Sequence, residues 1–101
     1  MGRRPNNGSD YLEYINKSGS IRELSIRVSK DANVDASEVI LKLPRVLDKL
    51  TEKQAKVIRK YYLQENSISN IKESMGFTSY AAVDKCIDSG VKRIIKCIAL
   101  L

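Results

Sequence analysis

Residues 67–94 read SISNIKESMGFTSYAAVDKCIDSGVKRI, and they carry the clearest structural pattern in the chain. It contains a short helical pattern over about residues 68–75 and a longer one that begins near residue 79. Gly76 separates them and suits the left-handed conformation that ends many helices. Either Thr78 or Ser79 can cap the second helix. A short helix, a glycine-centred turn and a longer helix predict a helix-turn-helix.

The second helix of this pair is the predicted reading helix. Val83 and Ile87 are expected to face the core, and Thr78 is expected to cap the helix and donate to a phosphate. A DNA major groove about 12 Å wide accepts one helix, which presents its N-terminal residues to the bases. The predicted base-reading residues are those left on the outer face: Ser79, Tyr80, Ala81, Asp84, Lys85 and Asp88.

The helix before this pair has the clearest start signal in the chain. Residues 51–54 form a Thr-x-x-Gln capping box, and Leu50 can pack on the helix as a hydrophobic staple. The side chains expected to face inward are Val57, Ile58, Tyr61, Tyr62 and Leu63.

Upstream, a short helix is expected first; it is capped by Ser9 or Asp10, ends at Ser18-Gly19 and carries Tyr11, Leu12, Tyr14 and Ile15. Two more helices are expected after it. Ser20 and Asp35 can cap them, each with a glutamate three residues later. The second has a broad apolar stripe, in which proline predicts a kink or a restart at Pro44. The residues of this stripe are Val39, Ile40, Leu43, Val46, Leu47 and Leu50.

No window alternates with the period of a strand, so the predicted fold is all-α, a small bundle of five to six helices with a C-terminal helix-turn-helix. We divide it into a disordered basic arm at residues 1–9, a supporting helical lobe at 10–50 and a DNA-binding lobe at 51–101. The segments at 20–24 and 34–40 weakly repeat the helix-turn-helix pattern. A tandem pair of DNA-binding lobes is therefore an alternative to a purely supporting first lobe.

Composition narrows the function. The chain has 101 residues, with 18 Lys and Arg against 12 Asp and Glu, a net charge of +6 that favours a polyanionic partner. It has no histidine, the commonest general base at neutral pH. The absence of histidine excludes most zinc enzymes and the enzymes that use a Ser-His-Asp triad or a Cys-His pair. We therefore expect no enzyme activity, cofactor or metal, and Cys86 and Cys97 are expected to pack in the core.

No apolar run approaches the roughly 18 residues needed to cross a bilayer, and no secretion signal begins the chain, so we expect a cytoplasmic protein without membrane contact.

Residues 50–98 resemble region 4 of sigma factors and its relatives among phage and bacterial regulators. The matching segments are 50–54 (LTEKQ), 57–62 (VIRKYY), 67–73 (SISNIKE), 75–78 (MGFT) and 91–94 (VKRI). The resemblance implies a sequence-specific regulator of transcription that binds double-stranded DNA in a bacterial or phage-infected cell. The opening LTEKQ and the motif after it are also similar to the DNA-binding part of phage terminase small subunits, which would imply a role in DNA packaging or recombination.

The chain departs from the sigma pattern in two ways. One extra residue lies between Thr78 and Val83, so base contacts cannot be transferred by register. Asp84 and Asp88 stand where the family has neutral or basic side chains, although an Asp can accept from a cytosine amine.

Cations around the predicted helix-turn-helix are candidates for contacts to the DNA backbone. Basic arms track DNA in several folds, which adds two arginines from the N-terminus. The full set of predicted backbone contacts is Thr78, Lys56, Arg59, Lys60, Lys72, Lys92, Arg93, Arg3 and Arg4.

The last turn of the chain predicts self-association. Ile94, Ile95 and Ile98 continue into Ala99 and a final Leu100–Leu101 pair, more apolar side chains than one helix face can cover. A homodimer would match a palindromic DNA site. Two alternatives remain open: the tail folds back on residues 39–47, or it contacts RNA polymerase in a protein-interaction module.

Overall fold

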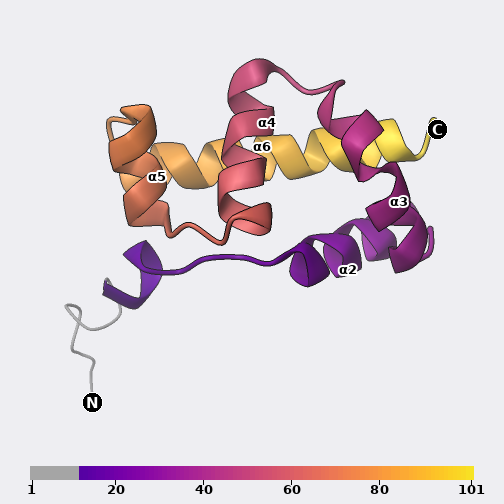
Figure 1. The fold of residues 1–101 in the computed structure, drawn as a ribbon, viewed down its shortest axis with the longest axis horizontal. Helices are drawn as coiled ribbons and strands as arrows, with labels where there is room; N and C mark the ends of the chain where they lie inside the picture. Colours follow the sequence, from indigo (N-terminus) through magenta and orange to yellow (C-terminus); the bar gives the residue numbers. More distant parts are fainter. Residues whose placement is uncertain (1–11) are drawn as a thin grey trace, which may run out of the picture.

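The computed structural model describes residues 12–101 and contains no strand within that range. A helical turn at residues 12–15 comes first (Figure 1). The helices after it are α2 (Ile21–Ala32), α3 (Ala36–Leu47), α4 (Glu52–Ile58), α5 (Ile68–Met75) and α6 (Tyr80–Ile98). A π-helical turn, η1 (Arg59–Leu63), continues α4 directly. The predicted all-α bundle of five to six helices is confirmed.

Side-chain oxygens start most of these helices. The hydroxyls of Ser20, Ser67 and Ser79 each accept a hydrogen bond from the backbone N–H three residues later, which satisfies a donor that the first turn leaves open. At Thr51 the predicted capping box is confirmed, with hydrogen bonds in both directions between Thr51 and Gln54. Asp35 stands at the N-cap position of α3, as predicted, but its side chain accepts no hydrogen bond from the first turn.

A left-handed residue ends both α2 and α5. Gly76 has a φ of 71° and ψ of 31°, as its sequence position predicts. At the end of α2 the same conformation is taken by Asn33, with a φ of 58° and ψ of 46°. Asparagine tolerates this region better than most residues with a side chain, so the turn between α2 and α3 needs no glycine.

Of the two alternatives predicted at Pro44, a kink or a restart, the restart is wrong, because α3 runs through this residue. Proline removes one backbone hydrogen bond and crowds the preceding turn. Pro44 stands in the second half of α3, where Leu43, Val46 and Leu47 are buried on either side of it. Burial of these neighbours holds the backbone in helical form across the lost bond.

The long helix α6 forms the centre of the molecule. It contacts α2, α3, α4 and α5, and Figure 1 shows it running behind α4 across most of the structure. A close approach between α4 and α6 is possible because Gly90 has no Cβ: one placed there would lie 2.8 Å from Ile58 Cγ1. One hydrophobic core takes residues from both predicted lobes, and Ile94 and Ile98 of the last turn belong to it.

Two residues expected to face inward are exposed. Leu63 has an exposed fraction of 39% and Ile40 of 43%. The π-helical turn accounts for Leu63, since its wider i→i+5 bonding, seen in the bond from Gln64 N–H to the Arg59 carbonyl, rotates the last residue away from the core. The same turn buries both Tyr61 and Tyr62, whose rings meet edge to face with centroids 4.8 Å apart.

Among residues 12–101, no helix combines the length and the apolar character that spanning a membrane requires.

Candidate nucleic-acid interface

The turn between α5 and α6 is short and closely held. Phe77 N–H donates to the Lys72 carbonyl at 3.0 Å, a bond typical of a helix that ends at a left-handed residue. Ser79 caps α6 by accepting from Ala82 N–H at 3.0 Å. Thr78 is exposed and precedes the cap, so of the two caps predicted for this helix Ser79 is confirmed and Thr78 is wrong. Its hydroxyl is thereby left at the surface beside the start of α6.

Five of the six predicted base-reading residues line one groove along the N-terminal half of α6. The groove has a volume of about 660 Å³, and we call it the α6 groove. Its walls include Tyr14 and Lys17 before α2 and Arg27 within α2. The predicted residues that line it are Ser79, Ala81, Asp84, Lys85 and Asp88.

Tyr80, the sixth candidate, is directed toward α5 instead. The ammonium of Lys72 lies 5.1 Å from the centroid of its ring, a cation–π contact. Its carbonyl accepts a hydrogen bond from the Tyr14 hydroxyl at 3.3 Å. Two predicted DNA contacts, Tyr80 and Lys72, are thus engaged with each other.

Asp88 is held by two cations. Its carboxylate accepts from Arg27 at 2.8 Å and lies 3.2 Å from the ammonium of Lys92. The hydrogen bond from Arg27, followed by that from Lys92, lowers the pKa of Asp88 below its ordinary value. A base amine would have to compete with these two partners for the carboxylate.

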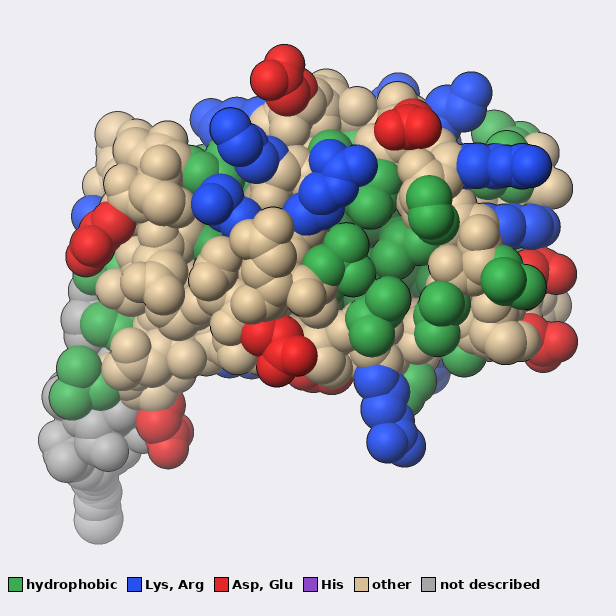
Figure 2. All heavy atoms as spheres, viewed as in Figure 1, with side chains coloured by type: hydrophobic (Ala, Val, Ile, Leu, Met, Phe, Trp, Pro, Cys, Tyr) green, Lys and Arg blue, Asp and Glu red, His purple; other side chains and the backbone are tan. Residues whose placement is uncertain are grey.

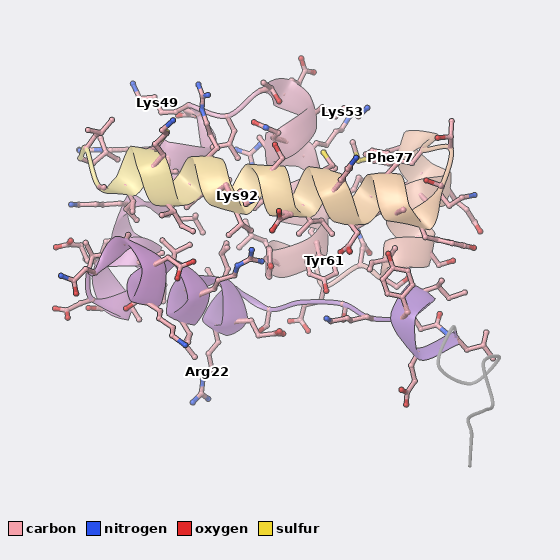
Figure 3. All side chains as sticks on the ribbon, turned by 180° about the vertical axis from the view of Figure 1, so that it is seen from behind. Arg22, Lys49, Lys53, Tyr61, Phe77 and Lys92 are labelled. Atoms are coloured by element: carbon pink, nitrogen blue, oxygen red, sulfur yellow. The ribbon has the colours of Figure 1, made fainter. Side chains whose placement is uncertain are left out.

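The side chains of Tyr61 and Tyr62 also line the α6 groove. Figure 3 shows Tyr61 between α6 and the segment that leads into α2. Burial raises the pKa of Tyr61 to about 12, so its phenol stays neutral and can donate a hydrogen bond at neutral pH. Gly19 makes this packing possible, because a Cβ there would lie 2.6 Å from the Tyr62 ring and 2.7 Å from the Tyr61 ring.

Cations line the face of α6 on which Figure 3 shows Lys92. Two hollows of about 480 and 460 Å³ lie along it and share Gln54 and Ser89, whose side chains are hydrogen-bonded at 2.8 Å. At 1.5 Å per residue, Lys85 and Lys96 stand about 16 Å apart. We call this row the basic α6 face; it consists of Lys53, Lys85, Lys92, Arg93 and Lys96.

The other predicted backbone contacts do not join this row. Arg59 lines a groove with residues of α2 and α3, and Lys60 lines a hollow with Asn66 and Asn70. Lys56 is exposed on α4. The predictions for Arg3 and Arg4 lie outside the described residues.

Sequence reasoning missed three cations of the site. Lys96 had a signal, since it stands four residues after Lys92 and eleven after Lys85, which places all three on one side of a helix. Lys53 reaches the site because its ammonium lies 4.7 Å from the centroid of the Phe77 ring, across the α5–α6 turn. Arg27 had no signal, since its partner Asp88 lies 61 residues away.

The two cysteines are free and half-buried against the core. Burial raises the pKa of the Cys86 thiol above its ordinary value, against a smaller opposing effect of Lys53. The thiol therefore stays protonated at neutral pH.

Comparison with protein-family models, curated proteins and solved structures finds no match to this chain.

Proposed function

We propose that this protein is a sequence-specific regulator of transcription that binds double-stranded DNA and reads it with α6. One observation carries the proposal: the α6 groove, which gathers five predicted base-reading residues, adjoins the basic α6 face through Lys85, which lines both. Groups that can read bases and groups that can neutralise phosphates therefore lie along a single helix. In DNA-binding proteins, contacts to phosphates position the protein on the duplex and contacts to base edges specify the sequence.

The electrostatic part of the proposal rests on the basic α6 face. Lys85, Arg93 and Lys96 make no ion pair with any residue of 12–101, so their charges are available to phosphates. Thr78 lines the same hollow as Lys85, and its exposed hydroxyl can donate to a phosphate. Each neutralised phosphate releases counterions, which makes affinity fall as salt rises.

The reading part rests on the first turns of α6. A helix about 10–12 Å in diameter fits the major groove. Ala81 and Lys85 are exposed there, and Asp84 can accept from a cytosine amine. Tyr14, Lys17 and Arg27 wall the groove on the other side, so DNA would approach from the side of the basic α6 face.

Footprinting on the genomic DNA of the source tests this function. A discrete protected site at a promoter is the expected result. Protection confined to a packaging or recombination site would replace regulation with the role implied by the likeness to terminase small subunits. Absence of any protected site, at low salt as well as at physiological salt, would contradict DNA reading.

Variants of single lysines sharpen the test. Lys85→Ala is expected to reduce the ratio of specific to random DNA affinity, because this side chain lies beside the reading residues. Arg93→Ala is expected to weaken both affinities alike and to lower the salt slope by about 0.9, because Arg93 lines the basic α6 face and makes no ion pair within residues 12–101. Lys30→Ala is the matched control, since this lysine is exposed on α2 and lines neither hollow of the basic α6 face.

A further inference from the structure

Three of the six predicted base-reading residues have partners within the protein. The ring of Tyr80 has the ammonium of Lys72 5.1 Å from its centroid. The carboxylate of Asp88 accepts from Arg27 at 2.8 Å. The hydroxyl of Ser79 accepts from a backbone N–H as the cap of α6. A base would have to displace each of these contacts before it could use the side chain.

The other three, Ala81, Asp84 and Lys85, are exposed in the first two turns of α6. Within residues 12–101, neither Asp84 nor Lys85 makes an ion pair. Spacings of three and four residues place the three on one side of the helix, and all of them line the α6 groove. At 1.5 Å per residue, Ala81 and Lys85 stand about 6 Å apart along the axis, close to two base steps of about 3.4 Å each. The three residues can therefore meet two or three successive base pairs.

Lys85 lies on the side of α6 that Figure 3 presents. Lys92, labelled there, follows Lys85 by seven residues, which is close to two helical turns and leaves both on one side of the helix. The opposite face of the molecule, drawn in Figure 2, gathers hydrophobic side chains into a patch that suits a phosphate backbone poorly. A duplex therefore meets these residues from the α6 side.

The carboxylate of Asp84 selects among the four bases, because an ionised carboxylate only accepts hydrogen bonds. In the major groove, guanine and thymine present acceptors, and adenine presents the acceptor N7 beside its amino group. Cytosine alone presents a donor, N4, without an acceptor next to it. Since phosphates repel a carboxylate, Asp84 also lowers affinity for any duplex that offers it no donor.

Lys85 has the complementary preference. Its ammonium only donates hydrogen bonds, and guanine presents two acceptors, O6 and N7, at its major-groove edge. Because Lys85 directly follows Asp84, a guanine beside the cytosine is within its reach. Ala81 carries only a methyl group, which lets the helix approach the base edges closely.

We infer that α6 recognises a cytosine through the carboxylate of Asp84 and a guanine beside it through the ammonium of Lys85. The inference rests on the proposed DNA binding and adds to it the bases that are read. Lys17 and Arg27 line the same groove, but within residues 12–101 neither forms an ion pair with Asp84, so this carboxylate remains available to a base.

The test begins with a selection of binding sites. Full-length protein is mixed with a pool of duplexes of random sequence, and the bound duplexes are sequenced. A cytosine beside a guanine is expected in the selected site. In a duplex of this site, N4-methylcytosine still pairs with guanine but offers no N–H to the major groove, and it is expected to weaken binding about tenfold. 5-Methylcytosine keeps the N4 donor and is the control, which is expected to retain most of the affinity.

Asp84→Asn gives a second readout. An amide can bind adenine at N6 and N7, so the variant is expected to prefer adenine where the wild type prefers cytosine. It is also expected to bind random DNA more tightly, because one negative charge is removed. Asp31→Asn is the matched control, the same change of charge at an exposed position of α2, and should leave the base preference unchanged. Lys85→Ala is expected to relax the preference for guanine.

Three results would overturn the inference: selected sites without a cytosine beside a guanine, equal binding of cytosine and N4-methylcytosine, or an unchanged base preference in Asp84→Asn. In each of them a duplex is still bound, so the proposed DNA binding stands. Absence of binding to any duplex, at low salt as well as at physiological salt, is a distinct result and contradicts the proposed function and the inference together.

Discussion

The guanidinium of Arg27 in α2 lies 2.8 Å from the carboxylate of Asp88 in α6. This pair joins two helices across 61 positions of sequence, and Lys92 approaches the same carboxylate to 3.2 Å. A side chain that the sequence assigns to base reading therefore also connects α2 to the proposed reading helix. Any base that uses Asp88 would loosen this connection.

Acid is expected to remove the contribution of this pair to stability. Because the pKa of Asp88 is lowered in the folded state, the carboxylate stabilises the fold above its unfolded pKa of about 3.9, and the effect is lost as pH falls through the folded pKa. The side chains are 42% and 46% exposed, so the pair contributes only about 0.2–1 kcal/mol. Urea unfolding of the wild type and of Asp88→Asn measures this: the two stabilities should differ at neutral pH and converge in acid.

A double-mutant cycle checks the partner. Arg27→Ala combined with Asp88→Asn should cost less than the sum of the two single changes, since either one breaks the bond. Strict additivity would show that the pair does not couple α2 to α6.

Gly90→Ala is expected to destabilise the fold although alanine is the better helix former. A Cβ at Gly90 would lie 2.8 Å from Cγ1 and 2.9 Å from Cδ1 of Ile58, which is fully buried and has little room to move. Overpacking costs about 1–3 kcal/mol, whereas helix propensity returns about 1 kcal/mol. Thermal or urea unfolding should show a net loss of stability.

Ile58→Val provides the matched test of this clash, because it removes one of the two crowded atoms. The double variant should lose less stability than the two single variants added together. If Gly90→Ala raises the melting temperature, the close approach of α4 and α6 is wrong.

The stability of the fold at alkaline pH tests the burial of the Tyr61 phenol. Its pKa is raised to about 12 by burial, above the value of about 10 in an unfolded chain. The protonated phenol is favoured in the fold, so its contribution is fully present below pH 10 and is lost as pH rises from about 10 to 12. Tyrosinate absorbance should show late titration in the wild type, and Tyr61→Phe should reduce the loss of stability over this range. An unchanged slope in Tyr61→Phe would contradict the burial.

Local signals in the sequence predict most of the fold. Thr51 with Gln54, Ser67 and Gly76 mark helix ends through bonds to residues three to five positions away, so a linear reading finds them. Pro44 misleads, because the burial of its neighbours depends on helices distant in sequence. Leu63 misleads for another reason: a π-helical turn changes the angle between successive side chains, and no residue type announces it.

The candidate site, too, is predicted by the sequence only where it depends on local spacing. Helical spacing brings Ala81, Lys85 and Asp88 to one side of α6, as predicted. Spacing says nothing of Arg27, which arrives from α2 and engages Asp88, or of Lys72, which engages Tyr80. These contacts across helices decide which side chains remain available to a ligand.

The end of the chain leads to the last prediction, which concerns self-association. Ile94 and Ile98 are buried in the chain's own core, while Leu100 is 84% and Leu101 45% exposed. A homodimer through the last turn therefore depends on these two leucines, and deletion of residues 100–101 leaves the buried part of α6 intact. Sedimentation should show a lower mass for the shortened chain, with unchanged helicity and weaker binding to a palindromic DNA site, because a two-fold dimer engages both half-sites.

Leu41→Ser is the control for a general loss of exposed apolar surface and should leave the mass unchanged. A full-length chain that sediments as a monomer at micromolar concentration would contradict the dimer and leave the two leucines to another partner.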